Sequence, residues 1–208
     1  SLFNSDSHIY SEFAGKSVIS VNEDSNGSLW VCTSHDGLYR LNEKEKNIFH
    51  FDIDRLINSG AYNKTSVFGE YTDLDGNAWI KSLQGIYRCR QHGNALEVTA
   101  HFPYVTTSLS EDREGNIWFG SYSSNYRIKR GTDNVEEIPA FLKGTYIFIN
   151  DIVQLKDGRM LAVAFAQNPK IIDPATLEVK DMDLLSKFSH TFIPTGICED
   201  SQGLIWIG

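Results

Sequence analysis

The sequence predicts an all-β fold, a β-propeller of four-stranded blades present as a partial arc of about four complete blades plus parts of two others. The first observation is a phrase that recurs as EDSNGSLWV, TDLDGNAWI, EDREGNIWF, QLKDGRMLA and EDSQGLIWI. The second is the spacing of its glycines by 39 to 49 residues, which is the length of one propeller blade. These glycines are Gly27, Gly76, Gly115, Gly158 and Gly203.

Each copy of the phrase predicts a β-hairpin. Apolar runs such as SVISV before it and LWVCT after it suit two strands, and the polar residues between them suit a tight turn. An aspartate at the start of the turn can accept hydrogen bonds from backbone amides two residues on, and the glycine supplies a positive φ. The aspartates are Asp24, Asp73, Asp112 and Asp200, and Leu155 stands at this position in the fourth copy.

A third and a fourth apolar run complete each unit, as GLYRLN and NIFHFD do in the first. Four strands per unit make one blade. The residue seven positions before each glycine is Ser20, Gly69, Ser108, Asp151 or Gly196, and the mostly small side chains suit crowded inner strands. The tryptophans are expected to fill the space between blades, with Met160 and Leu161 doing so in the fourth unit. They are Trp30, Trp79, Trp118 and Trp206.

The units are expected at residues 17–65, 66–104, 105–147 and 148–192, with 193–208 as a partial unit. Residues 1–16 are interpreted as the end of a preceding blade and a linker. Because a propeller must close to avoid free sheet edges, the chain is interpreted as an arc of a larger ring. A five-bladed ring completed by the N-terminal strand is the alternative, although it would lack one strand. Only 52–60 and 183–188 have the character of short helices.

The composition bounds the function. Lys and Arg total 19 against 27 Asp and Glu, so the net charge of -8 opposes a nucleic-acid partner. The sequence has neither an apolar run of about 18 residues that would span a bilayer nor a signal-peptide pattern. The first residue is Ser1, which leaves open that the chain is a piece of a longer protein. The cysteines Cys32, Cys89 and Cys198 are expected to be buried in strands.

No motif for catalysis or for a cofactor is present. The sequence lacks a nucleophile elbow, a P-loop and a dinucleotide fingerprint, and its six histidines have no metal-ligand spacing. The glycine turns lack the spacing of a calcium loop. Acidic pairs such as Glu136 with Glu137 and Asp181 with Asp183 are interpreted as solvated edges rather than as glycosidase carboxylates. We therefore expect no enzyme, no metal and no cofactor.

The phrase SVISVNEDSNGSLWVCTSHDGLYRLN resembles the regulator propeller repeat, in which an E-D pair, a glycine, a tryptophan and a G-L-x-R ending recur. In the third unit Asn125 takes the place of the second glycine, and the fourth unit lacks the aspartate, tryptophan and glycine together. The resemblance implies the periplasmic sensor region of a hybrid two-component system of the histidine kinase and response regulator type. It implies an oligosaccharide ligand from a polysaccharide, further blades and signalling domains as partners, a possible homodimer, and membrane attachment only through flanking segments.

Ligand-binding residues are expected on the loops between second and third strands and between blades, at the end opposite the glycine hairpins. Aromatic faces that stack on sugar rings and polar groups that bind hydroxyls favour them. The candidates are His35, Asp36, Tyr62, Gln84, Tyr122, Asn125, Tyr146, Gln167, Asn168 and His190. A protein-interaction scaffold without a small ligand and a propeller lyase remain as alternatives.

Overall fold

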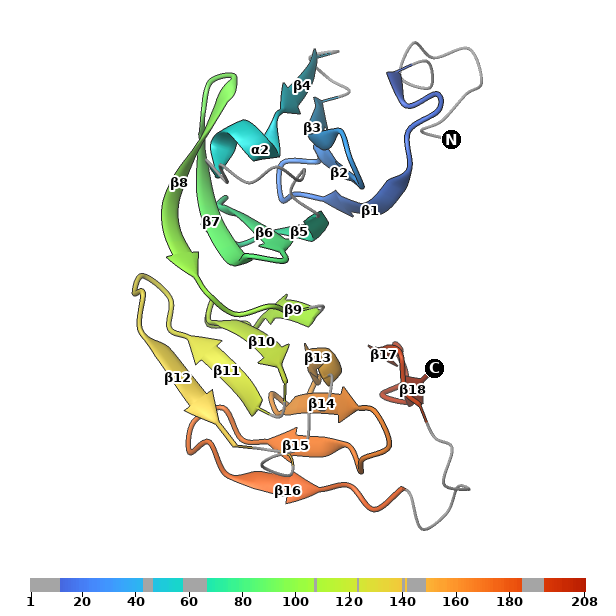
Figure 1. Cartoon of the computed structure of the whole chain (residues 1–208). Helices are drawn as coiled ribbons and strands as arrows, with labels where there is room; N and C mark the ends of the chain where they lie inside the picture. Colours follow the sequence, from blue (N-terminus) through green and yellow to red (C-terminus); the bar gives the residue numbers. More distant parts are fainter. Residues whose placement is uncertain are drawn as a thin grey trace. The chain divides into compact units, whose positions relative to one another are not determined.

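The computed structural model describes residues 12–42, 47–57, 67–106, 108–122, 124–139, 141, 149–184 and 193–208 (Figure 1). The chain divides into two compact units, one ending at Pro103 and one beginning at Tyr104. Both are built from antiparallel sheets in which each strand pairs with the next strand in sequence. The all-β prediction is confirmed.

The first unit contains two four-stranded sheets, called here the first and second blades. The first consists of β1 (Val18–Glu23), β2 (Leu29–Thr33), β3 (Gly37–Asn42) and β4 (Asn47–Phe51). The second consists of β5 (Val67–Thr72), β6 (Ala78–Ser82), β7 (Gly85–His92) and β8 (Ala95–Phe102). The short helix α2 (Ile53–Leu56) follows β4, within the segment expected to be helical, and Asp52 caps it by accepting the Arg55 amide.

The second unit contains two more four-stranded sheets and a hairpin. The third blade consists of β9 (Ser108–Glu111), β10 (Ile117–Ser121), β11 (Ser124–Ile128) and β12 (Val135–Ile138). The fourth consists of β13 (Ile149–Gln154), β14 (Met160–Ala164), β15 (Lys170–Ile172) and β16 (Val179–Asp181). The fifth phrase forms the two-stranded half-blade of β17 (Ile197–Glu199) and β18 (Ile205–Ile207).

Within each unit the sheets pack face to face. In the first unit Trp30 and Cys32 of β2 share a buried apolar cluster with Ala78 and Ile80 of β6. In the second unit Trp118 of the third blade is buried with residues of the fourth, including Ile152, Met160 and Ala162. The second strands are therefore the centre of each core, since their side chains are buried on both faces.

Close approach between neighbouring sheets explains one glycine. A Cβ atom on Gly120 would lie 2.3 Å from Cγ2 of Ile149 in the next blade, far inside van der Waals contact. Ser108, which is opposite Gly120 in the ladder, is also buried and points its hydroxyl toward the carbonyl of Ile149 at 3.5 Å. Small side chains on these strands thus let two backbones approach.

The cysteines divide into two kinds. Cys32 and Cys89 are buried in strands, and burial raises the pKa of the Cys32 thiol to about 11 and that of Cys89 to about 12. Cys198 is exposed in the half-blade, so the expectation that it is buried was wrong. None of the helices in the described ranges is long and apolar enough to cross a membrane.

Candidate functional site

The glycine hairpins hold an aspartate bonded to a tryptophan. In the first blade one carboxylate oxygen of Asp24 accepts the amides of Asn26 and Ser28, both at 2.9 Å. The other oxygen accepts the indole N–H of Trp30, six residues later, at 3.1 Å. The same indole bond joins Trp79 to Asp73 at 2.8 Å, Trp118 to Asp112 at 2.7 Å and Trp206 to Asp200 at 2.8 Å. The hydrogen bonds from the backbone amides to the aspartate are predictable from the sequence. The hydrogen bond from the indole is not, because no local sequence pattern indicates it.

An arginine from the third strand completes each of the first three pairs. It lies directly across the ladder from the tryptophan, with its guanidinium over the indole ring. The pairs are Arg40 over Trp30 at 5.6 Å, Arg88 over Trp79 at 5.8 Å and Arg127 over Trp118 at 5.3 Å. Arg40 also forms an ion pair with Asp24 at 3.0 Å. Burial alone would raise the pKa of Asp24, but the bonds from Ser28, Trp30 and Arg40 outweigh it and hold the pKa below its usual value.

The fourth blade replaces all three members of this group together. Leu155 takes the place of the aspartate, Leu161 that of the tryptophan, and Ile171 lies opposite Leu161 where the arginine would be. These three side chains form one buried apolar cluster. A buried carboxylate without its donors would be costly, so the polar group is replaced as a whole rather than one residue at a time. The glycine-hairpin end of every blade is thus structural.

The opposite end of the blades carries the turns between second and third strands. His35 and Asp36 lie between β2 and β3, Gln84 between β6 and β7, and Tyr122 between β10 and β11. Gln167 and Asn168 lie between β14 and β15, and Asn125 is within β11. Tyr62, Tyr146 and His190 lie outside the described residues. The topology therefore places seven of the predicted residues at this end, distributed over both units.

Asp36 is held in a structural contact. Its carboxylate accepts hydrogen bonds from the Lys16 ammonium and, at 3.0 Å, from the Tyr39 hydroxyl. The Lys16 bond, followed by the Tyr39 bond, lowers the pKa of Asp36, and Asp36 in turn raises that of Lys16. A ligand at Asp36 would compete with these partners.

A tyrosine–histidine pair fixes this turn in the first two blades. Tyr39 stacks on His50 with ring centroids 4.5 Å apart, and Tyr87 stacks on His101 at 4.3 Å. His50 Nε2 lies 2.5 Å from the carbonyl oxygen of Asp36, and His101 Nε2 lies 2.9 Å from that of Gln84. The sequence reasoning missed this pair, although the signal is present as a Y-R dipeptide in the third strand and an H-F dipeptide ending the fourth.

The third blade builds this turn without glycine. Because Arg127 pairs with Trp118 as Arg40 pairs with Trp30, Ser124 takes the place of the second glycine, and the assignment of Asn125 to it was wrong. Asn125 instead replaces a core residue equivalent to Leu38. It is fully buried, and neither side-chain polar atom has a hydrogen-bond partner in the chain as described.

Two exposed aromatic side chains lie on the turns of the second unit. Tyr122 is 49% exposed and has φ of 52°, a left-handed conformation that tyrosine rarely adopts. Phe165, which the sequence reasoning missed, is 51% exposed beside Ala166, whose φ is 50°. The Asn168 amide oxygen accepts the Leu184 backbone N–H at 3.1 Å, so Asn168 supports the turn. Tyr122 and Phe165 are thus each about half exposed on these turns.

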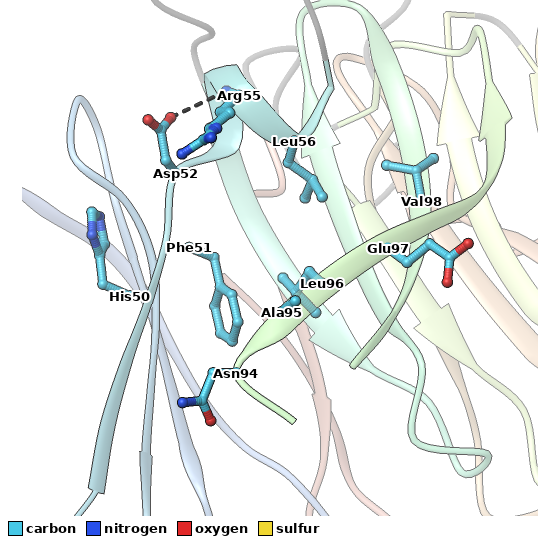
Figure 2. A pocket seen from close by; sticks show the side chains of 10 residues that line it. All are labelled: His50, Phe51, Asp52, Arg55, Leu56, Asn94, Ala95, Leu96, Glu97 and Val98. Carbon is cyan, nitrogen blue, oxygen red and sulfur yellow. Dashed lines mark hydrogen bonds between the residues drawn. The ribbon is translucent and has the colours of Figure 1, made fainter. Parts of the chain in front are cut away.

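A groove of about 580 Å³ lies between the outer strands of the first and second blades (Figure 2). Its floor is apolar, with Phe51 and Leu96 buried and Leu56 and Val98 partly buried. Figure 2 shows Phe51 and Leu56 reaching from β4 and α2 toward Leu96 of β8. The exposed rim carries acidic and basic side chains, an imidazole and an amide: His50, Asp52, Arg55, Asn94 and Glu97. No sequence motif marks the groove because its walls come from segments about 40 residues apart.

A buried carboxylic acid lies at the seam between the inner strands of the first two blades. Glu70 of β5 is 3% exposed and accepts the Thr72 hydroxyl at 2.7 Å. The Asn22 amide of β1 donates to the Glu70 backbone carbonyl at 2.6 Å and lies 3.4 Å from its carboxylate. Burial raises the pKa of Glu70 to about 7, against the opposing effects of Thr72, Asn22 and Lys81, while Asp24 also raises it.

The described residues contain no group of three or more His, Cys, Asp or Glu that could hold a metal ion.

Comparisons with known proteins agree with the repeat. The model of the two-component regulator propeller family matches residues 12–35, 102–123 and 187–208. No curated protein matches the chain significantly. Among solved structures, the extracellular domain of the putative hybrid two component system BT4673 from B. thetaiotaomicron is similar, with 18% identity and a TM-score of 0.69 over 92% of this chain. That of BT3049 from the same organism has 21% identity and a TM-score of 0.67 over 92% of the chain.

A lyase has a similar fold. Virginiamycin B lyase from Staphylococcus aureus aligns over 92% of this chain and 63% of its own, with 14% identity and a TM-score of 0.69. The chain covers 26% of the two sensor domains, so it spans about a quarter of their length. At these identities the likeness shows the β-propeller fold alone.

Proposed function

We propose, from the premise that the chain carries the repeats of the two-component regulator propeller family, that it is a segment of an extracytoplasmic sensor propeller. The protein would be a hybrid two-component regulator anchored in the inner membrane, with this segment in the periplasm. The observation that carries the proposal is the repeat itself, matched in three separate segments. The fold shared with two extracellular sensor domains supports it.

The ligand we propose is an oligosaccharide released from a polysaccharide. Tyr122 and Phe165 expose aromatic faces on neighbouring blades of one unit, and such faces stack on the apolar side of sugar rings. His35 is exposed on the corresponding turn of the first blade and adds a polar group. Asp36, Asn168 and the buried Asn125 would support these turns rather than contact the sugar.

A glycan array probed with the chain, followed by calorimetry, tests this proposal. We expect saturable binding of one glycan class and at least a tenfold loss in Tyr122→Ala, since a desolvated aromatic contact is worth on the order of 1–2 kcal/mol. Leu74→Ala is the matched control because Leu74 is exposed to a comparable degree, at 59% against 49% for Tyr122, but lies in a glycine hairpin. Equal losses in both variants, or turnover of the glycan, would contradict the assignment.

A protein-interaction scaffold is the second candidate, and the groove between β4 and β8 favours it. An apolar floor with acidic and basic side chains on its rim suits side chains of a polypeptide better than sugar hydroxyls, because the floor's aromatic ring, that of Phe51, is 5% exposed. Crosslinking from a photoreactive residue placed at Asn94 would capture a protein partner if this candidate is correct. Glycan binding that is unaffected by a large side chain at Asn94 would separate the two functions.

A further inference from the structure

The second blade has a carboxyl group where the other blades have an aliphatic side chain. In β5, Tyr71 pairs with Trp79 across the ladder, and Glu70 is the residue before it. Glu70 itself pairs with Ile80, a member of the apolar cluster that the first two blades share. The residues at the position of Glu70 in the other blades and in the half-blade are Val21, Leu109, Ile152 and Ile197. A carboxyl group thus stands at a position that otherwise carries apolar side chains.

This position lies at the contact between two blades. Strand β5 of the second blade lies beside β1 of the first (Figure 1), and we call this contact the β1–β5 seam. The Asn22 side-chain amide of β1 donates to the Glu70 backbone carbonyl at 2.6 Å and lies 3.4 Å from Oε2 of the same residue. Glu70 is 3% exposed, so its carboxyl group is shielded from water. The carboxyl group therefore lies beside a hydrogen bond that joins the two strands.

The groups around Glu70 stabilise an ionised carboxylate only in part. Thr72 donates its hydroxyl to Oε1 at 2.7 Å. Among the charged groups that act on Glu70, Asp24, which follows β1, opposes the ionised form and Lys81 of β6 favours it. Cys32 of β2 also lies near Glu70, and burial raises the pKa of its thiol to about 11, so this group is neutral. An ionised Glu70 would thus be a buried charge with incomplete compensation, which is costly unless water reaches it.

We propose that the β1–β5 seam is a proton-controlled contact, which is closed when Glu70 is protonated and opens locally to water when Glu70 ionises. The protonated carboxyl group is neutral and can remain in the apolar core, whereas the carboxylate gains its full hydration only where β1 and β5 separate. The chain would then respond to the pH around it. This inference goes beyond the proposed ligand-binding function, because it depends on Glu70 and its neighbours and on no ligand.

The direction and the size of the response follow from proton binding. Burial raises the pKa of Glu70 to about 7 in the closed seam, and an opened, hydrated carboxyl group would have its usual pKa of 4.5. Opening followed by ionisation therefore releases a proton, and the equilibrium shifts toward the open form as the pH rises. Between about pH 4.5 and pH 7.5 the opening constant should increase roughly 100-fold.

Hydrogen–deuterium exchange of the intact chain across this pH range, corrected for the intrinsic pH dependence of amide exchange, tests the proposal. We expect amides of β1 and β5 to gain roughly 100-fold in corrected exchange rate, while amides of β3 and β7 in the same unit change less. Glu70→Gln and Glu70→Leu should each remove the increase, since neither side chain can ionise. Glu23→Gln is the matched control, because Glu23 is an exposed carboxylate on β1, and this variant should keep the increase.

Three results would overturn the proposal. An increase of the same size in β3 and β7 would show that the whole unit unfolds and that the seam does not open locally. An increase that persists in both Glu70 variants would assign the pH dependence to another group. Corrected exchange rates in β1 and β5 that stay constant with pH would show that protonation of Glu70 does not control the seam.

Discussion

The aspartate–tryptophan pair of the third blade should behave as one unit when it is mutated. Asp112 is 3% exposed and accepts the Trp118 indole at 2.7 Å and the Asn116 amide at 2.9 Å. Asp112→Leu removes the acceptor of these two buried donors and of the Asn116 side-chain amide, which also donates to the carboxylate at 2.9 Å, and each orphaned donor costs about 1–3 kcal/mol. We therefore expect the free energy of unfolding to fall by about 4 kcal/mol.

Replacing the partner as well should recover part of this loss. Trp118→Leu alone should cost about 3–5 kcal/mol because it removes buried volume and leaves the Asp112 carboxylate without its indole. The double variant places leucines where the fourth blade has Leu155 and Leu161, and it removes both the unpaired indole and the unpaired carboxylate, while Arg127 and the Asn116 amide remain. We expect it to cost about 1–3 kcal/mol less than the sum of the two single variants.

Urea unfolding followed by circular dichroism measures all three variants. Asp200→Leu is the matched control, since Asp200 makes the same bonds to Trp206 and to two amides but is only partly buried, and its loss should be smaller. Additivity of the single variants within about 0.5 kcal/mol would refute the coupling. A loss at Asp200 equal to that at Asp112 would show that burial is not the cause.

Three further predictions concern the first unit. Because burial raises the pKa of Glu70 to about 7, the unfolded carboxyl ionises first, so the free energy of unfolding should fall by about 3 kcal/mol as pH rises from about 4.5 to 7. Glu70→Gln should remove that slope in urea titrations across this range, and an unchanged slope would contradict it. Gly85→Ala should lower the melting temperature more than Gly76→Ala does. Both glycines have a positive φ, but only a Cβ atom on residue 85 would lie 2.2 Å from the Phe102 carbonyl oxygen. Equal losses in thermal melts would show that the clash is relieved. Trp30→Ala should lower the unfolding free energy by about 3–5 kcal/mol, and a melting curve superimposable on the parent's would disprove its role between blades.

The fold could be predicted because its determinants are local. The residues that specify each hairpin lie within about ten positions, as from Asp24 in the turn to Cys32 in the second strand, and the pattern occurs five times in the chain. The register of the third strand is less local, and for that reason Asn125 was assigned to the glycine position. Its place opposite Gly120 depends on the pairing of Arg127 with Trp118, which only the ladder shows.

The candidate site could be predicted only in outline. The turns that carry Tyr122 and Gln167 follow from strand order, so their end of the blade is deducible. The partners of each side chain at this end cannot be deduced from strand order. Asp36, for example, accepts a hydrogen bond from Lys16, which lies 20 positions earlier in the chain. Phe165 had no motif to mark it, and its exposure depends on how the turn folds.

The two ends of a blade differ in how their polar groups are used, and this favours one end for binding. At the hairpin end Asp112 already accepts two amides and an indole, so a ligand there would have to break bonds that stabilise the fold. At the other end two of the three described non-glycine residues with positive φ occur, Tyr122 and Ala166, on turns beside exposed aromatic rings. Backbone in sparsely populated conformations clusters at binding sites, where it orients side chains. We therefore expect ligand specificity to change with substitutions in these turns and stability to change with substitutions in the hairpins.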